Sequence, residues 1–230
     1  DEAAYNNNTK GNVSTAYGVL VDGKAICEGY ARAFQLLCNK LGIECVSIAG
    51  MTGDVGHEWN CAKIDGNWYQ VDVTWNDSQD DFSNYYYFNL TDEQMYSSHR
   101  ADDLFDEIEP DNYNNDENLI GNLYLPECNS TEYNYYNQTA PILYAFDEEN
   151  DNTISNALAN SAVNGDNYFN IIVDDSLDFE DAYSTLVQDG YVVNYIESAN
   201  NMLWGEVELD TSSYAYKNDT LRVITIVLNY

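Results

Sequence analysis

The chain has 230 residues, of which 44% are hydrophobic, which suits one large or two small folded domains and excludes a disordered acidic tail. It carries 40 acidic side chains against 8 basic ones, so its formal net charge at pH 7 is -32. Because such a charge repels phosphate groups, we expect no binding of nucleic acid. No run approaches the roughly 18 consecutive apolar residues of a membrane span, so we expect no membrane-spanning segment.

The clearest predicted helix covers residues 24–42. Its apolar residues recur at intervals of three and four, as on the buried side of a helix, at Ala31, Phe34, Leu37, Cys38 and Leu41. Gly42 stands where a left-handed residue commonly ends a helix. Cys27 lies four residues before Ala31, which places it at the start of this helix.

After the helix, the sequence predicts three strands, over residues 44–49, 57–64 and 67–75. Asp65-Gly66 between the last two is a typical two-residue hairpin turn. With that turn Trp59 faces Asp72, so His57 and Asp72 become diagonal neighbours on one face, about 7–8 Å apart at Cα. A four-residue loop preserves this arrangement, whereas a three-residue loop would put Asp72 on the opposite face.

The second half shows a different pattern. Residues 111–118 are polar, have no apolar period and follow Pro110, so they are predicted to form a surface loop or linker. From Tyr133 onward, strand-like runs alternate at first with helical runs, in the outline β-α-β-α-β-β. The predicted strands are 142–146, 168–173, 191–196, 203–209 and 221–228, and the predicted helices lie near 151–163 and 178–188.

Cys27, His57 and Asp72 together suit nucleophilic chemistry. A free thiol has a pKa of about 8.5, but a helix N-terminus and a neighbouring imidazolium lower it to roughly 3.5–7.5. The N–H groups at the start of a helix can also hold an oxyanion. Each of the three residues alone is common in ordinary cores and surfaces. In this order, however, they match the nucleophile, base and orienting group of acyl transfer.

The segments that carry these residues are GKAICEGYA at 23–31, HEWN at 57–60 and WYQVDVTW at 68–75. They resemble the transglutaminase-like superfamily, specifically its bacterial secreted and surface-exposed group. The later stretch YYYFNLTDEQMYSSHR is similar to that group as well. The resemblance extends over residues 10–105.

By this resemblance Cys27 is the nucleophile, His57 the general base and acid, and Asp72 the residue that orients His57. It implies an α+β fold with a papain-like transglutaminase core, in which the helix that carries the cysteine packs on an antiparallel sheet. We expect this catalytic domain over residues 1–125, truncated at its N-terminus because related domains have a further helix upstream. A smaller accessory α+β domain is expected over residues 126–230.

The resemblance implies cysteine-dependent acyl transfer at an amide carbonyl through a thioester on Cys27. The acceptor is water in a peptidase or amidase and an amine in a protein-glutamine transglutaminase, and both remain open. The alternative is a non-catalytic cell-surface binding or adhesion module on the same fold. We expect a peptide or protein substrate, such as a cell-wall or surface protein, an extracellular or cell-surface location, and no cofactor.

Three tryptophans of the predicted hairpin, Trp59, Trp68 and Trp75, are either core aromatics or walls of a substrate cleft. Trp59, Asn60 and Tyr17 are the candidates for substrate contact, and Asn60 or Tyr17 is also a candidate donor to an oxyanion.

No metal site is predicted. The acidic runs at 77–81 and 147–151 lack the glycine and the terminal glutamate of a calcium loop. With 2 histidines, and no CxxC spacing among the 5 cysteines, a zinc site is not expected either. The four cysteines other than Cys27 are expected to be buried thiols, namely Cys38, Cys45, Cys61 and Cys128.

Overall fold

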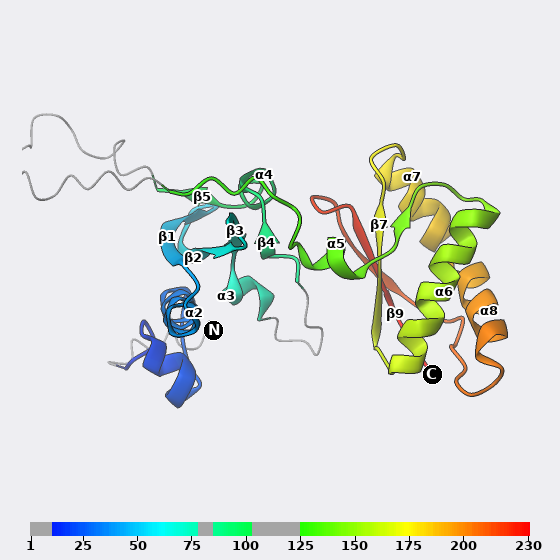
Figure 1. Ribbon diagram of the computed structural model, residues 1–230, viewed down its shortest axis with the longest axis horizontal. Helices are drawn as coiled ribbons and strands as arrows, with labels where there is room; N and C mark the ends of the chain where they lie inside the picture. Colours follow the sequence, from blue (N-terminus) through cyan, green and yellow to red (C-terminus); the bar gives the residue numbers. More distant parts are fainter. Residues whose placement is uncertain (1–10, 78–84, 103–124) are drawn as a thin grey trace, which may run out of the picture. The chain divides into compact units, whose positions relative to one another are not determined.

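The computed structural model describes residues 11–77, 85–102 and 125–230. The chain divides into two compact units, Asp1–Asn134 and Tyr135–Tyr230. Each described unit combines helices with a sheet (Figure 1), which confirms the predicted α+β class. The loop predicted over 111–118 lies outside the described residues. Within the described parts, no helix is both long enough and apolar enough to cross a bilayer.

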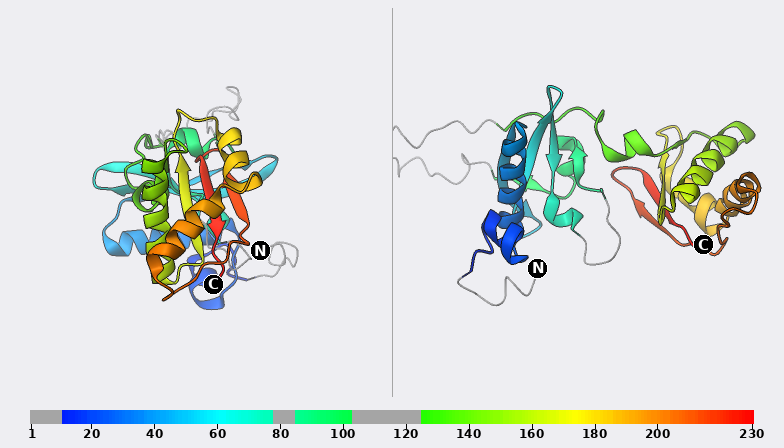
Figure 2. Two further views of the ribbon diagram at one scale, coloured as in Figure 1. Left: turned by 90° about the vertical axis from the view of Figure 1, so that its right-hand side faces the viewer. Right: turned by 60° about the horizontal axis from the view of Figure 1, so that its bottom comes forward.

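The first unit is built on an antiparallel sheet with the strand order β4-β3-β2-β1-β5. Helix α2 lies against strands β1 and β2 of this sheet (Figure 2). The elements in chain order are η1 (Gly18–Asp22), α2 (Cys27–Leu41), β1 (Cys45–Thr52), β2 (Val55–Ile64), β3 (Asn67–Val71), α3 (Val73–Asn76), β4 (Phe88–Leu90), α4 (Asp92–Met95) and β5 (Arg100–Ala101).

Helix α2 matches the predicted helix, except that it begins at Cys27. It ends, as predicted, at Gly42, whose φ of 77° is left-handed. Its apolar stripe differs in part, because Leu37 and Leu41 are exposed. Small residues such as Ala31 line the buried side. The helix therefore comes close enough to the sheet for the Asn60 amide to donate to the Ala31 carbonyl at 3.1 Å.

The hairpin of β2 and β3 has the predicted register. Ile64 pairs with Asn67 across a two-residue turn in which Asp65 and Gly66 have φ values of 47° and 92°. Two residues with positive φ are typical of a type I′ turn, whose twist matches that of the strands. The predicted assignment of side chains to the two faces of the hairpin is therefore confirmed as far as Val71.

The strand predicted over 67–75 ends early. Asp72 is extended, but its carboxylate Oδ1 accepts hydrogen bonds from the backbone N–H groups of Thr74 at 2.9 Å and Trp75 at 3.1 Å. Asp72 is thus the N-cap of helix α3. An aspartate that satisfies these N–H groups favours a helix start over continuation of a strand, which explains the difference from the prediction.

Gly50 in β1 lets the chain return beside this hairpin. A Cβ at this position would lie 2.2 Å from the carbonyl oxygen of Arg100 and 2.6 Å from the ring of Trp59. Without a side chain, β1 can pair with β5 through Gly50 and Ala101. This pairing brings the residue just before β5, His99, next to His57 and Trp59 in the first half of β2.

The segment before helix α5 packs with the first unit, although the sequence analysis placed the domain boundary at 125/126. The hydroxyl of Tyr69 donates to Ser130 Oγ at 2.9 Å. The amide of Asn89 donates to the carbonyl of Tyr133 at 2.8 Å. Residues 125–134 are therefore hydrogen-bonded to strands of the first unit.

The second unit contains a mixed sheet with the strand order β6-β7-β9-β8, in which β6 and β7 are parallel and the other pairs antiparallel. Apolar residues of its helices and strands form one buried core. The elements are α5 (Tyr135–Thr139), β6 (Ile142–Leu143), α6 (Glu148–Asn164), β7 (Tyr168–Val173), α7 (Phe179–Tyr183), η3 (Ser184–Gln188), α8 (Val192–Leu203), β8 (Ala215–Asn218) and β9 (Val223–Val227).

Two of the strand predictions for this unit, those over 191–196 and 203–209, were wrong. Tyr191 is the N-cap of helix α8 and residues 192–196 belong to that helix, whose buried residues recur with helical spacing at Val192, Tyr195, Ile196, Ala199 and Leu203. Residues 203–209 form no strand, because the left-handed Trp204 and Gly205 end the helix with φ values of 52° and 79°. Strand β8 was missed.

Candidate active site

Cys27 is the first residue of helix α2 and is partly exposed. The preceding Ile26 is extended and provides no side-chain cap, although its carbonyl accepts from Gly29 N–H at 2.9 Å. Gly29 lets the upstream chain pack here, since a Cβ on it would lie 2.4 Å from the Val13 carbonyl oxygen. Cys27 therefore lies at the positive end of the helix dipole, which favours a thiolate.

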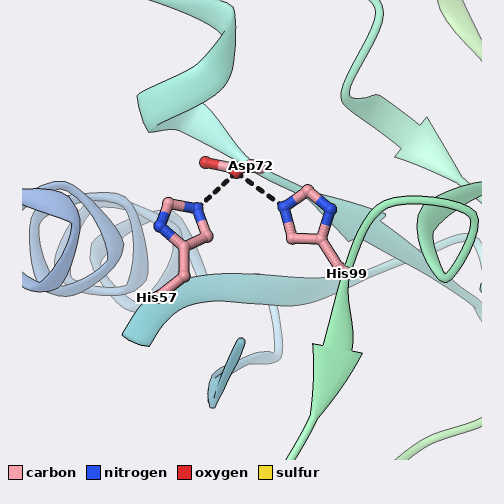
Figure 3. A group of neighbouring side chains, drawn as sticks. All are labelled: His57, Asp72 and His99. Carbon is pink, nitrogen blue, oxygen red and sulfur yellow. Dashed lines mark hydrogen bonds and ion pairs between the residues drawn. The ribbon is translucent and has the colours of Figure 1, made fainter. Parts of the chain in front are cut away.

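His57 and Asp72 are joined by a hydrogen bond, with 2.6 Å between His57 Nε2 and Asp72 Oδ2. Figure 3 shows the imidazole of His57, from β2, turned toward the carboxylate at the end of β3. Because Nε2 is engaged by Asp72, Nδ1 is the nitrogen that remains for the hydrogen bond between His57 and Cys27. The imidazole thus connects the thiol with the carboxylate.

The electrostatics of this group favour a thiolate and an imidazolium. The hydrogen bond from His57 lowers the pKa of Cys27, and this effect outweighs burial, which acts in the opposite direction. Burial by itself would lower the pKa of His57, but hydrogen bonds and charges of Asp72 and Cys27 outweigh it and raise that pKa to about 9. Because the pKa of Cys27 is lowered and that of His57 is raised, the proton is favoured on the nitrogen of His57 over the sulfur of Cys27.

The carboxylate of Asp72 is fully buried, with 0% of the residue exposed. Burial would raise its pKa, but hydrogen bonds from His57 and His99, together with the charge of His57 and the Trp75 N–H group, lower the pKa overall. Its Oδ1 atom accepts from the two backbone N–H groups that begin α3. A buried carboxylate with this many donors stays ionised and has a fixed orientation.

His99 is the residue of this site that sequence reasoning missed. Its Nε2 lies 3.0 Å from Asp72 Oδ2, and Ser98 Oγ lies 2.8 Å from its Nδ1. Only 3% of His99 is exposed. Its position depends on helix α4, since the His99 N–H group donates to the Met95 carbonyl at 3.1 Å. The sequence did offer a signal, because His99 belongs to the stretch YYYFNLTDEQMYSSHR, which resembles the same superfamily group.

Aromatic rings enclose the imidazole of His99. The ring centroids of Trp75, Trp59 and Tyr87 lie 4.6, 5.0 and 5.6 Å from that of His99. The His57 ring lies at 5.4 Å. In this apolar surrounding a polar ring nitrogen needs a partner, and Asp72 and Ser98 supply one to each.

Two of the three predicted substrate-contact residues are buried. Trp59 is 1% exposed, and its indole N–H donates to Gln70 Oε1 at 2.6 Å. Its ring packs against the rings of His57 and His99 in the interior. Asn60 is 0% exposed and binds α2 through the Ala31 carbonyl. Tyr17 is 54% exposed. Among the hairpin tryptophans, Trp75 is both 36% exposed and near His57, with 5.8 Å between ring centroids.

His57, Asp72 and His99 also form a group whose ligand atoms could hold a metal ion, since these atoms lie within 4.8 Å of one another. Their separations of 2.6 and 3.0 Å are, however, hydrogen-bond distances. Ligands about 2.0–2.1 Å from a tetrahedral zinc ion would lie roughly 3.3 Å apart. The three side chains are therefore arranged for hydrogen bonding. The remaining cysteines, Cys38, Cys45, Cys61 and Cys128, are buried free thiols, as expected.

Part of this chain is similar to known proteins. Kyphoscoliosis peptidase from Mus musculus is 30% identical over 108 residues, which is 42% of this chain and 16% of that protein. The protein of the same name from Homo sapiens is 29% identical over 108 residues, with the same coverage. The chain thus spans about a sixth of the length of these relatives.

A family model of the transglutaminase-like superfamily matches residues 1–73, a segment that contains Cys27, His57 and Asp72. Members of this superfamily are cysteine-based peptidases and acyltransferases. Residues 1–73 are therefore similar to the core of the transglutaminase-like superfamily.

Proposed function

We propose that this protein is a cysteine-dependent enzyme that attacks amide carbonyl groups. Cys27 is the nucleophile, His57 the general base and acid, and Asp72 the residue that orients His57. The observation that carries the proposal is the position of His57, which is hydrogen-bonded both to the Cys27 thiol and to the buried Asp72 carboxylate.

Acylation begins with the proton of Cys27 on His57. The thiolate attacks the carbonyl carbon, and the carbonyl π electrons move to oxygen, which gives a tetrahedral oxyanion. When the oxyanion collapses, the C–N bond breaks and His57 donates its proton to the departing amine. The products of this step are a thioester on Cys27 and a free amine.

Deacylation uses the same residues in reverse. His57, now neutral, accepts a proton from water or from an incoming amine as that molecule attacks the thioester carbonyl. The C–S bond then breaks and the thiolate is restored, paired again with the imidazolium. Water gives an acid, and an amine gives a new amide.

Backbone N–H groups support the charged states at sulfur. The Glu28 and Glu58 N–H groups both hydrogen-bond the Cys27 sulfur and lower the pKa of its thiol, after the larger effects of His57 and burial. Glu28 belongs to the first turn of α2, where N–H groups point out of the helix end. Donors in this place are suited to an oxyanion that forms next to the sulfur.

We further propose a peptide or protein substrate, encountered outside the cell. The name of the two relatives, kyphoscoliosis peptidase, supports action on peptide bonds. A net charge of -32 suits a substrate or acceptor with positive charge, such as a lysine-bearing protein.

The test is a screen of peptide libraries, with and without an amine acceptor, on the intact chain and on Cys27→Ala. Turnover by the intact chain and none by the variant is expected. A chain that binds peptides without cleaving or modifying them, and whose Cys27 is no more reactive than an ordinary thiol, would instead be a binding module.

A further inference from the structure

The four cysteines outside the proposed active site lie in two pairs. Cys61 in β2 and Cys128, 67 residues later, have their sulfur atoms 3.5 Å apart. Both residues are 0% exposed. Two sulfur atoms from such distant parts of the chain therefore meet inside the first unit.

Cys128 is held in place by Asp92, the first residue of α4. The Cys128 N–H group donates to Asp92 Oδ2 at 3.0 Å, and the Asp92 N–H group donates to the Cys128 carbonyl at 2.8 Å. The Gln70 amide donates to Asp92 Oδ1 at 2.7 Å, and Gln70 pairs with Cys61 across β2 and β3. The same polar network thus positions both members of the pair.

Cys38 and Cys45 form the second pair. Burial raises the pKa of both thiols, and each thiol also affects the pKa of the other, so the two side chains lie near each other across the turn that joins α2 to β1. One turn earlier on α2, the Gln35 amide donates to the Cys45 carbonyl at 3.0 Å. The Ile43 N–H group donates to the Cys38 carbonyl at 2.9 Å, which closes the turn between them.

We propose that Cys38–Cys45 and Cys61–Cys128 become disulfides when the chain folds under oxidising conditions, so that Cys27 is the one thiol left free. Each bond joins two sulfur atoms and releases two protons and two electrons. A small disulfide such as oxidised glutathione accepts the electrons by thiol–disulfide exchange and leaves as two thiols. For Cys61–Cys128 the sulfur atoms must approach from 3.5 Å to about 2.0 Å.

This pairing accounts for the odd number of cysteines. An enzyme with a reactive thiol is at risk in an oxidising environment, because other thiols can capture that thiol as a disulfide. Once the other four cysteines are joined in two buried disulfides, Cys27 has no competing partner in its own chain. Since Cys61 and Cys128 are inaccessible in the folded protein, their bond must form during folding.

The experiment is to refold the full chain in a buffer of reduced and oxidised glutathione, and in parallel with excess dithiothreitol. Remaining thiols are alkylated in denaturant, and the digested protein is mapped by mass spectrometry. After oxidative refolding we expect one alkylated cysteine, Cys27, and two linked peptide pairs, Cys38–Cys45 and Cys61–Cys128. Five alkylated cysteines, or a disulfide that includes Cys27, would overturn the proposal.

Matched variants sharpen the test. Cys61→Ala and Cys128→Ala, made singly, should each raise the number of free thiols from one to two, whereas the double variant should return it to one. Dithiothreitol added to the folded oxidised protein should reduce Cys38–Cys45, at 6% and 8% exposure, before the fully buried pair. The peptide map of the unaltered chain needs no variant and decides the pairing by itself. Neither result depends on the proposed catalytic activity.

Discussion

His57 and His99 share one hydrogen-bond acceptor, the Oδ2 atom of Asp72, at 2.6 and 3.0 Å. The two imidazoles come from different parts of the fold, one from β2 and the other from the residue before β5. Only His57 continues to Cys27 through its second nitrogen. The second ring nitrogen of His99 is instead hydrogen-bonded to Ser98. His99 is therefore placed to position the Asp72 carboxylate, which in turn orients His57.

Replacement of His99 tests this positioning role. His99→Phe keeps a ring in the aromatic enclosure but removes the donor to Asp72. A lost hydrogen bond to a charged group is worth about 1.5–3 kcal/mol, so we expect kcat to fall about 10- to 100-fold. His99→Gln, whose amide N–H can reach the carboxylate, should retain more activity.

The pH profile separates positioning from a general structural defect. Without the donor from His99, the charge of Asp72 acts more fully on His57, whose pKa should rise further above about 9. The alkaline limb of the kcat/KM profile should therefore move to higher pH in His99→Phe. In His99→Gln it should lie close to that of the unaltered protein. An unchanged limb and unchanged kcat in His99→Phe would leave His99 with a packing role alone.

Asp72→Asn tests the orienting carboxylate. Asparagine is also a good N-cap, so helix α3 and the fold should be retained. The amide cannot fix the tautomer of His57 or stabilise its imidazolium, and a comparable change in a serine protease lowers kcat on the order of 10⁴-fold. We expect a loss of this order with an unchanged circular dichroism spectrum. A variant with near-normal turnover would mean that another group orients His57.

Alkylation of Cys27 should show its lowered pKa directly. With iodoacetamide and mass spectrometry by site, Cys27 should react first and at a pH below that of an ordinary thiol. Burial raises the pKa of Cys38, and that of Cys45 to about 12, so these thiols should react slowly. Equal rates at all five cysteines would exclude an activated Cys27.

The same titration distinguishes the thiolate from the general acid. Above about pH 9 His57 loses its proton, while Cys27 remains ionised. Turnover should therefore fall on the alkaline side because the leaving amine receives no proton, whereas alkylation should continue. In His57→Gln the alkylation midpoint should rise toward the ordinary value of about 8.5.

The relationship of His57 to Asp72 was predictable because it depends on local geometry. A two-residue turn fixes the register, and the register fixes which side chains share a face. His99 lies 27 residues from Asp72, and its approach depends on α4, β5 and the space left by Gly50. No periodic pattern in the sequence carries that information, so the second histidine became evident only in the structure.

The second unit shows a different limit of sequence reasoning. Residues 191–196 contain β-branched and aromatic side chains, which favour a strand by propensity. The helical spacing becomes evident only when Ala199 and Leu203 are included, beyond the short run first considered. Tertiary packing of that stripe outweighs local preference.

A shortened chain tests whether the first unit carries the site alone. Residues 1–134 include the segment that binds Tyr69 and Asp92, and every described contact of Cys27, His57 and Asp72 reported above lies within them. We expect this fragment to keep the pH-dependent alkylation of Cys27. Residues 1–125 should be less stable, since they lose Cys128, which is the partner of Cys61 and forms two hydrogen bonds with Asp92. Loss of selective alkylation in a folded 1–134 fragment would mean that the second unit helps to build the site.

The last prediction concerns the acceptor of the thioester, for which we expect water to prevail over amines. Water is present at about 55 M, so an amine wins only where the site excludes water or binds the amine well. A channel for an incoming lysine needs apolar walls. Trp59 is buried and cannot form one, which leaves Trp75 as the exposed aromatic ring beside His57.

The net charge of -32 acts at an earlier stage of the reaction. It raises the rate at which cationic acceptors encounter the protein, and salt screens this effect, but partition of the thioester is decided next to Cys27. The measurement uses a glutamine-containing peptide and a labelled amine, with Cys27→Ala as the control, and compares hydrolysed with amine-linked product. We expect the hydrolysed product to dominate at low and high salt. A predominance of amine-linked product at millimolar amine would make the protein a transglutaminase and would require a second apolar wall opposite Trp75.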